Sequence, residues 1–285
     1  MMARAPAGAD TALRHPTSNA RCKVARVTVP NGADDVPAAL PPAPDFSPLA
    51  ATYARSRPTY PAELFAWLAG LVDRHQLAWD CATGSGQAAL GLAHHFSRVV
   101  ASDRSARQLE HAPRHPRVEY RLASADASGL PATSVDLVTV ASALHWLDFA
   151  SFFAEAGRVL HPGGVLAAWT YHPALCEPPL DRAFHRLYWH VLRPYYDQRS
   201  AHVDRKYADV AMPGEPIAAP PFAVTATWDL EGALDFARTW SGSIAYRQAT
   251  GEDPAEIIRA ELAPFFAESP VRTVRIPLFL RVARL

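Results

Sequence analysis

This sequence of 285 residues has no long hydrophobic run, only three cysteines and no excess of one charge. No stretch approaches the roughly 18 apolar residues that a membrane-spanning helix needs. The three cysteines, Cys22, Cys81 and Cys176, lie far apart without a CxxC pair, which argues against a disulfide scaffold and a thiolate zinc site. With 28 Lys and Arg against 28 Asp and Glu, the formal charge is zero, which argues against binding nucleic acid or an acidic membrane mainly by electrostatics.

These absences favour a soluble, cytoplasmic globular protein that is an enzyme or a small-molecule binder. We expect a monomer or a homodimer that uses neither nucleic acid, nor a membrane, nor a metal. Aromatic residues are also absent from residues 1–45, which hold seven prolines. Such a segment cannot bury enough apolar area to offset the entropy of ordering it, so we predict a disordered leader there and one domain over 46–285. The early arginines leave a transit peptide open as an alternative.

From Phe46 onward, short apolar runs alternate with stretches of helical periodicity. Strands separated by helices at this spacing are joined by right-handed crossovers, so we predict a Rossmann-like α/β fold with a parallel, doubly wound sheet. The apolar runs predict strands at 77–82, 98–103, 118–123, 135–141 and 165–171.

Residues 172–221 interrupt this alternation. They are rich in aromatic and basic residues and carry prolines at both ends. This composition is typical of a helical insertion, and we predict that it covers the active site. The apolar runs at 271–282 then end the pattern as strand material.

A glycine turn, Gly84-Ser-Gly86, follows the first predicted strand. Its glycines let the backbone turn tightly and let a ligand approach the main chain closely. Open parallel sheets bind ligands at the carboxyl ends of their strands, and Asp103, which ends the second strand, can accept both hydrogen bonds of a ribose diol. This combination fits NAD as well as any other adenosine-containing ligand.

Asp80 distinguishes between these ligands. It directly precedes the turn, where a dinucleotide places its pyrophosphate, and a carboxylate there repels a phosphate by about 1 to 4 kcal/mol. The same charge attracts the sulfonium and ammonium groups of S-adenosylmethionine (SAM). The third glycine of a dinucleotide-binding GxGxxG is also missing, because Ala88 and Ala89 stand there. The sequence therefore favours SAM, with a capping role for Asp80 as the alternative.

Together these residues resemble motif I of the class I SAM-dependent methyltransferases. The stretch Asp80-Cys-Ala-Thr-Gly-Ser-Gly86 carries the resemblance, followed by Asp103, the Ser124-Ala-Asp126 loop and Arg158-Val-Leu-His-Pro-Gly-Gly164. Ala82 stands where motif I has its first glycine, and a residue this small should still permit the turn. Similarity to the trans-aconitate methyltransferase-like (methyltransferase type 11) group comes from the segments 53–61, 143–146, 195–207 and 240–246.

The resemblance implies a sheet of seven strands with the last strand antiparallel, and a site for SAM. It places Asp80 and Gly84 beside the methionine part, Asp103 at the ribose, Ala125 at the edge of the adenine ring and Asp126 at the adenine amino group. Taken alone, Asp126 is equally well explained as a turn acid that bonds its own backbone. The predicted cofactor-binding residues are Asp80, Ala82, Gly84, Gly86, Asp103, Ala125 and Asp126.

The methyl acceptor is expected at the same edge of the sheet. His145, just after the fourth strand, can deprotonate the acceptor, hydrogen-bond it, or cap the next helix, and we favour positioning over base catalysis. Arg57 can hold a carboxylate in a bidentate pair, with an exposed helix face as the alternative. The predicted acceptor-binding residues are Tyr53, Arg57, Tyr60, His145, Trp146, Tyr195, Tyr196 and Arg199.

These features predict an enzyme that transfers a methyl group from SAM to a carboxylate or hydroxyl of a small molecule by in-line displacement. Orientation and proximity alone can contribute roughly 7 to 11 kcal/mol to such a reaction. A nicotinamide-dependent dehydrogenase is a second interpretation, which Asp80 opposes. A SAM-binding module without catalysis is a third, which the aromatic insertion weakly opposes.

Overall fold

The computed structural model describes residues 59–172 and 178–285 of the chain. All of these residues belong to one compact unit. The predicted leader (1–45) and the predicted acceptor-binding residues Tyr53 and Arg57 lie outside the described residues, so the expectations about them stay predictions.

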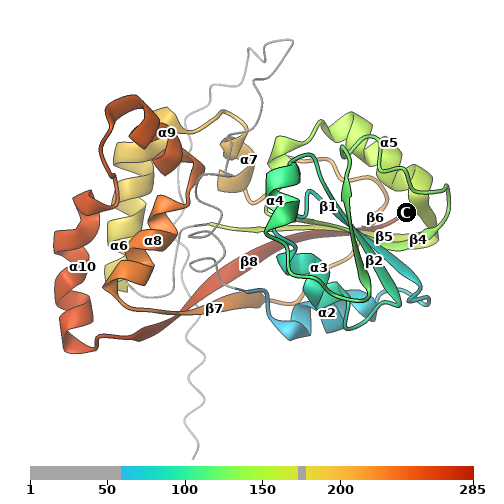
Figure 1. Ribbon diagram of the computed structural model, residues 1–285, viewed down its shortest axis with the longest axis horizontal. Coiled ribbons are helices and arrows are strands. Elements are labelled where there is room, and N and C mark those ends of the chain that lie inside the picture. Colours follow the sequence, from blue (N-terminus) through green and yellow to red (C-terminus); the bar gives the residue numbers. More distant parts are fainter. Residues whose placement is uncertain (1–58, 173–177) are drawn as a thin grey trace, which may run out of the picture. The chain divides into compact units, whose positions relative to one another are not determined.

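Five parallel strands form the central part of the sheet (Figure 1). Their order across the sheet is β3-β2-β1-β4-β5, so the direction of winding reverses between β1 and β4. The predicted α/β fold with a parallel, doubly wound sheet is therefore confirmed. In chain order the five strands are β1 (Leu77–Cys81), β2 (Arg98–Asp103), β3 (Val118–Leu122), β4 (Val135–Ala141) and β5 (Leu160–Tyr171).

The last strand, β8 (Arg272–Arg284), runs antiparallel to β5, which confirms the expected direction of the final strand. Its second half, from Leu278 onward, pairs with β5, while its first half pairs with β7 (Phe222–Trp228). A two-residue strand, β6 (Glu215–Pro216), pairs with the end of β8. The described residues thus form eight strands rather than the seven expected, because β6 is added at the edge.

Helices connect the parallel strands, and local sequence sets where two of them begin. Ser105 accepts the backbone N–H of Gln108 at the start of α4, and Asp148 accepts the backbone N–H of Ser151 at the start of α5. Such side-chain caps satisfy N–H groups that have no partner inside the helix. The connecting elements are α2 (Ala62–Ala69), α3 (Gln87–Leu92), α4 (Ala106–Glu110), the short 3-10 helix η2 (Leu144–Trp146) and α5 (Phe149–Val159).

A second group of helices lies next to β7 and β8 (Figure 1). The sequence does not predict α9, because its small and polar residues show no clear apolar stripe. Gly242 explains part of its packing, since a Cβ atom there would lie 2.5 Å from Cε2 of Tyr196. The helices of this group are α6 (Pro178–Arg186), the π-helical η3 (Leu187–Leu192), η4 (Arg193–Tyr195), α7 (Ser200–Asp204), α8 (Leu230–Arg238), α9 (Ser241–Thr250) and α10 (Glu256–Glu268).

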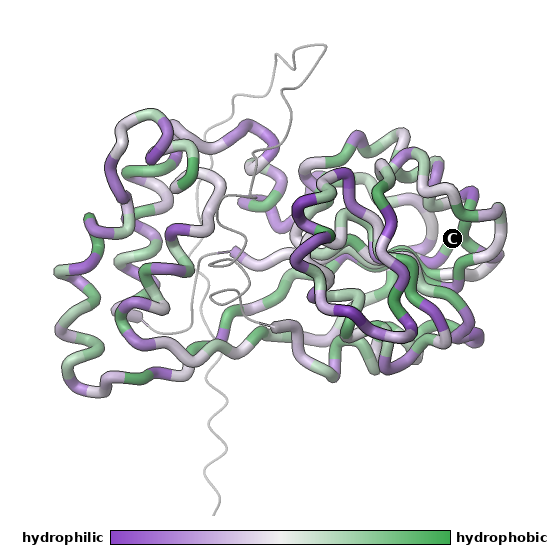
Figure 2. The backbone as a smooth tube through the Cα atoms, in the orientation of Figure 1, coloured by the Kyte–Doolittle hydropathy of each residue, from purple (hydrophilic) through white to green (hydrophobic). Residues whose placement is uncertain are grey.

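Both faces of the sheet are buried, each against its own hydrophobic core. Ala78 and Leu137 belong to one core, while their chain neighbours Trp79 and Val138 belong to the other. Because side chains alternate along a strand, a strand buried on both faces is mostly apolar, and Figure 2 shows hydrophobic residues along the central strands. This two-sided burial holds the carboxyl ends of the strands in fixed positions.

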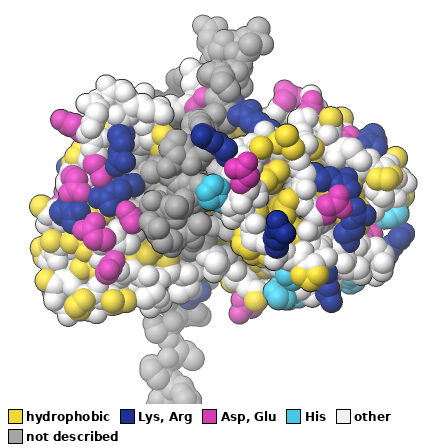
Figure 3. Space-filling model, in the orientation of Figure 1, with side chains coloured by type: hydrophobic (Ala, Val, Ile, Leu, Met, Phe, Trp, Pro, Cys, Tyr) yellow, Lys and Arg dark blue, Asp and Glu magenta, His cyan; other side chains and the backbone are white. Residues whose placement is uncertain are grey.

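The visible surface carries charges of both signs. Arg238, for example, contacts Asp235 at 2.8 Å and Asp253 at 2.6 Å, and Figure 3 shows basic and acidic side chains interspersed. Within residues 59–172 and 178–285, no helix has the length and apolar character needed to cross a membrane. The same residues contain no group of His, Cys, Asp and Glu arranged to hold a metal ion.

Candidate functional site

The glycine turn after β1 adopts left-handed backbone conformations. The φ angle is 54° at Ala82, 57° at Gly84 and 83° at Gly86. A Cβ atom at Gly86 would collide with the ring of Tyr120, whereas no atom of the described residues lies within 4 Å of a Cβ atom at Gly84. Ala82, in place of a glycine, adopts its conformation at a cost of roughly 1 to 2 kcal/mol. Gly84 therefore leaves open space beside the main chain.

Asp80 lies beneath this turn. Its fully buried carboxylate accepts a hydrogen bond from Thr83 Oγ1 at 2.5 Å and another from Thr139 Oγ1 at 2.8 Å. Burial raises the pKa of Asp80 to about 6, although both threonine hydrogen bonds act to lower it. Asp80 does not border the cleft described below, so its predicted contact with a ligand stays a prediction. The alternative considered for Asp80, a residue that holds the turn, matches its observed position.

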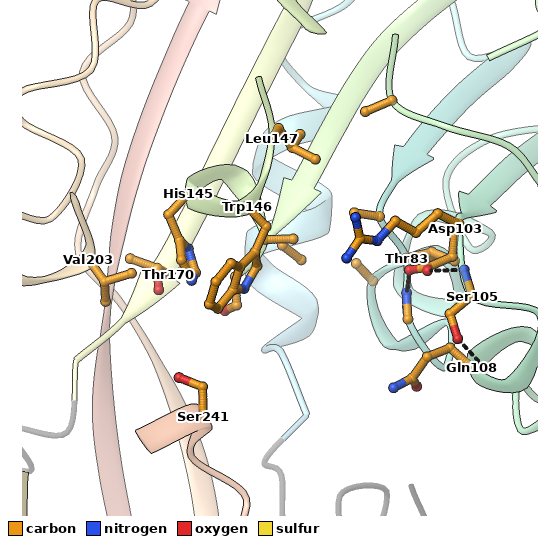
Figure 4. Close-up of a pocket in the computed structure, with 18 of the residues that line it drawn as sticks. Thr83, Asp103, Ser105, Gln108, His145, Trp146, Leu147, Thr170, Val203 and Ser241 are labelled. Carbon is orange, nitrogen blue, oxygen red and sulfur yellow. Dashed lines mark hydrogen bonds between the residues drawn. The ribbon is translucent and has the colours of Figure 1, made fainter. Parts of the chain in front are cut away.

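Asp103, at the end of β2, borders an open cleft directly. Its Oδ2 atom accepts the backbone N–H of Gly84 at 2.9 Å, and its Oδ1 atom accepts the backbone N–H of Ser105 at 2.9 Å. These bonds fix the carboxylate, and each oxygen keeps a second lone pair for a ligand. Figure 4 shows Asp103 together with Thr83, Ser105 and Gln108 at one end of the cleft. Asp103 is thus placed as the sequence predicts.

The loop after β3 carries Ala125 and Asp126 to the same end of the cleft. Glu155 of α5 fixes this loop, because its Oε1 atom accepts hydrogen bonds from both the backbone N–H and the hydroxyl of Ser128. Arg158 donates to Glu155 at 2.7 Å and to the Leu130 carbonyl oxygen at 2.8 Å. The hydrogen bonds from Arg158 are the main reason that the pKa of Glu155 is lowered to about 2.

Replacing Glu155 with Gln should lower the free energy of unfolding at neutral pH and make that free energy depend less on pH in the acid range. A depressed pKa stabilises the fold fully above the usual value of 4.5, and this stabilisation is lost as the pH falls toward 2. After allowing for the partial exposure of Arg158, we expect a loss of about 1 to 2 kcal/mol. Urea unfolding at several pH values measures it. In the control Glu268→Gln, which removes an exposed carboxylate 3.5 Å from Arg272, the curve should stay unchanged. If the wild type, Glu155→Gln and Glu268→Gln showed the same dependence of stability on pH, the stabilising role of Glu155 would be contradicted.

These elements enclose a cleft of about 700 Å³ at the carboxyl ends of the parallel strands. One end, defined here as the polar end, is bordered by Asp103, Arg104, Asp126 and Asp148. The opposite end, called the aromatic end, is bordered mainly by aromatic rings. It is also bordered by four residues with hydroxyl groups, Ser142, Thr170, Ser200 and Ser241. The rings that border the aromatic end belong to Tyr60, Trp146, Tyr171, Tyr188, Tyr196, Phe236 and Trp240.

His145 borders the aromatic end beside Trp146, as Figure 4 shows. Its Nδ1 atom lies 2.9 Å from the hydroxyl oxygen of Tyr207, which is fully buried. Burial lowers the pKa of His145 to about 3, with smaller contributions from the nearby His202 and Arg199. An imidazole with so low a pKa is a weak base. The geometry favours hydrogen bonding and positioning by His145.

Because His145 is neutral, its replacement should leave the pH dependence of catalysis unchanged. We expect His145→Gln to lower kcat by about fivefold, the equivalent of one hydrogen bond, with parallel pH profiles for the two proteins from about pH 5 to 8. Steady-state rates across this range provide the measurement. An inflection near pH 6.5 that is present in the wild type and lost in the variant would mean that His145 titrates during catalysis.

The remaining predicted acceptor residues divide into two groups. Tyr60 and Tyr196 border the cleft. Tyr195 lies off the wall, with its ring 5.0 Å from that of Tyr246. Arg199 is also off the wall, because it pairs with Asp197 at 2.8 Å and lies 4.8 Å over the ring of Trp146.

Several residues of the cleft were missed in the sequence. Tyr171 ends β5, so the rule that ligands bind at strand ends could have identified it. Tyr188 lies in η3 before β7, whereas Phe236 of α8 and Trp240, just before α9, follow β7, and no spacing in the sequence brings them together. Of the predicted turn residues, Gly86 does not border the cleft but is required for the turn.

Comparisons with known proteins bear on this site. A family model described as a methyltransferase domain matches residues 79–168. A candidate type II methyltransferase from Anaeromyxobacter dehalogenans, known as a structure, is 39% identical, with a TM-score of 0.73 over 80% of this chain and 97% of that chain. The chain belongs to the class I SAM-dependent methyltransferases.

Two further relatives carry methyltransferase names. A candidate methyltransferase from Dictyostelium discoideum is 28% identical over 247 residues, which covers 84% of this methyltransferase and 94% of the relative. An uncharacterized methyltransferase from Mycobacterium tuberculosis is 36% identical over 122 residues, about half of its length. The trans-aconitate methyltransferase-like group stays a prediction.

The residues of the polar end fit SAM, the methyl donor that the family implies. Gly84 leaves room beside the main chain that a Cβ atom would otherwise fill, and it borders the cleft. Asp103 offers a fixed carboxylate to a ribose diol, as the predicted role requires. The buried Asp80 supports the turn from below.

Proposed function

We propose that this methyltransferase acts on a hydroxyl group of a small, uncharged acceptor that carries an aromatic or extended apolar part. The contrast between the two ends of the cleft carries the proposal. Among the described residues, the aromatic end is bordered by the rings of seven Tyr, Trp and Phe residues, by the imidazole of His145, and by no Lys or Arg. A carboxylate acceptor would lose its hydration there without gaining a counter-charge, whereas a hydroxyl finds hydrogen-bonding partners. The hydroxyl alternative is therefore preferred to the carboxylate.

The polar end is proposed to hold the donor. Asp103 would accept the ribose hydroxyls, Asp126 the adenine amino group, and Ala125 would border the adenine ring. The methionine part would then lie along the turn at Gly84 and Ala82. All five residues border the same cleft, which supports this placement.

Orientation is the main contribution that the chain makes to the reaction. When bound, SAM supplies an electrophilic methyl group on a positively charged sulfur. The rings of Tyr188, Tyr196 and Trp240 would hold the acceptor and exclude water that competes for this methyl group. Neutral His145 would direct the acceptor through a hydrogen bond. No metal-assisted step is needed in this scheme.

Turnover of a small acceptor panel tests the proposal. With methyl-labelled SAM, we expect labelled ethers from phenol and 1-naphthol, and at least tenfold slower transfer to benzoate and benzylamine. Tyr196→Ala, which removes a ring from the aromatic end, should raise the acceptor KM. The matched change in the neighbouring Tyr195→Ala, off the cleft wall, should not. Faster transfer to benzoate, or no transfer to any hydroxyl, would contradict the proposal.

A further inference from the structure

We propose that Tyr188 and Asp204 accept the proton that the acceptor hydroxyl loses during methyl transfer. Tyr188 would contact the acceptor oxygen, and Asp204 would act through Tyr188. The inference rests on the proposed function, because an ionised carboxylate acceptor has no proton to lose.

The hydrogen bond between Tyr188 and Asp204 links the aromatic end of the cleft to a buried carboxylate. Tyr188 borders the cleft, and its hydroxyl donates to Asp204 Oδ1 at 2.6 Å. Because the O–H bond points at the carboxylate, the oxygen of Tyr188 keeps lone pairs that can accept a hydrogen bond from an acceptor. The ring of Tyr188 packs against those of Tyr196 and Trp240, with ring centroids 4.6 Å and 6.1 Å away, and this packing holds Tyr188 in place.

Asp204 lies behind the cleft wall at the end of α7. Its side chain is only 3% exposed. Besides Tyr188 from η3, it faces Arg193 from η4 at 3.5 Å and His172, which follows β5, at 3.6 Å. Arg193 places a positive charge beside the carboxylate, and His172 is a second group to which the proton can pass afterwards.

The other titratable groups near the acceptor are poorly suited to this task. His145 has a strongly lowered pKa because it is buried, and its Nδ1 atom is occupied by Tyr207. Burial also raises the pKa of Tyr188 well above its usual range, so a free Tyr188 phenolate is not the base. Transfer of the proton through Tyr188 to Asp204 avoids that phenolate, since Tyr188 gives up one proton as it gains another.

The step balances in atoms and charge. The acceptor oxygen forms a bond to the methyl carbon as the carbon–sulfur bond breaks, and the electron pair of that bond stays on sulfur. The acceptor O–H proton moves to the oxygen of Tyr188, and the Tyr188 proton moves to Asp204. The products are a methyl ether, a neutral thioether and a neutral Asp204. The positive charge of the sulfonium and the negative charge of Asp204 disappear together.

Phenols of graded acidity provide the test. The variants Tyr188→Phe and Asp204→Asn keep the shape of each side chain. For each variant, kcat is measured with phenol, 1-naphthol and 4-nitrophenol. The assay pH is chosen so that only 4-nitrophenol is ionised. We expect kcat with the two neutral phenols to fall by about a hundredfold, in keeping with the usual contribution of acid–base catalysis. With 4-nitrophenol, which has already lost its proton, the variants should retain wild-type kcat within about threefold.

A matched control is Tyr246→Phe, which removes another tyrosine hydroxyl that donates to a carboxylate, that of Glu252 at 3.3 Å, away from the cleft. Its kcat with every phenol should equal that of the wild type. Thermal unfolding shows whether Asp204→Asn folds, and Tyr188→Phe alone suffices if it does not. Equal losses with all three phenols, or no loss with any, would overturn the proton route. A wild type that methylates none of the phenols would instead overturn the proposed function.

Discussion

Asp103→Ala should reduce the affinity for SAM by at least about tenfold while the chain stays folded. A hydrogen bond to a charged group is worth roughly 1.5 to 3 kcal/mol, and a ribose diol offers two donors to this carboxylate. The change also removes acceptors for the N–H groups of Gly84 and Ser105, so part of the loss will come from a looser turn. Isothermal titration calorimetry with SAM measures the affinity, and circular dichroism measures the fold.

The control for this change is Asp229→Ala. Asp229 caps α8 by accepting the backbone N–H of Gly232 at 2.8 Å, and it does not border the cleft. Its loss should cost about 1 kcal/mol of stability and leave the SAM affinity unchanged. Unchanged affinity in Asp103→Ala would refute the ribose assignment. A loss of affinity in both variants would show that capping, and not ligand contact, is being measured.

Gly84→Ala should lower the affinity for SAM by more than about tenfold with only a small loss of stability. The residue has a φ of 57°, which costs an Ala roughly 1 to 2 kcal/mol. Its new methyl group would meet no atom of residues 59–172 or 178–285 within 4 Å, and Gly84 borders the cleft where the methionine part of the donor is proposed to lie. Calorimetry with SAM and thermal unfolding separate the two effects.

Gly251→Ala is a matched control, because it introduces the same backbone strain at a position that does not border the cleft. Gly251 ends α9 with a φ of 78°, and a Cβ atom there also meets nothing within 4 Å. Both variants should lose a similar amount of stability, and only Gly84→Ala should lose affinity. If the two variants bind SAM equally well, the donor does not lie along the turn.

The positions of the strands and of Asp103 could be predicted because their causes are local. The segments 98–103 and 135–141 are mostly apolar, as burial on both faces of a parallel sheet favours, and they begin and end where predicted. Asp103 closes one of these runs, so its place at the mouth of the sheet follows directly. Strand direction was also predictable, except for the added strand β6.

The parts that could not be predicted depend on tertiary packing. The charge of Asp80 is evident in the sequence, but its burial below the turn depends on Thr139, which lies 59 residues away along the chain. The aromatic end combines Tyr188 of η3 with Phe236 of α8 and Trp240, and only the folded chain brings them together. The neighbours Tyr195 and Tyr196 were predicted to act together, yet only Tyr196 borders the cleft.

A calorimetric titration of the purified methyltransferase with SAM, S-adenosylhomocysteine and NAD⁺ tests the central claim most directly. The claim is that the turn after β1 and the carboxylate of Asp103 hold a nucleoside with a positively charged sulfur. We predict binding of SAM and of its demethylated product at a single site, and no binding of NAD⁺. Binding of NAD⁺ without binding of SAM would contradict the account.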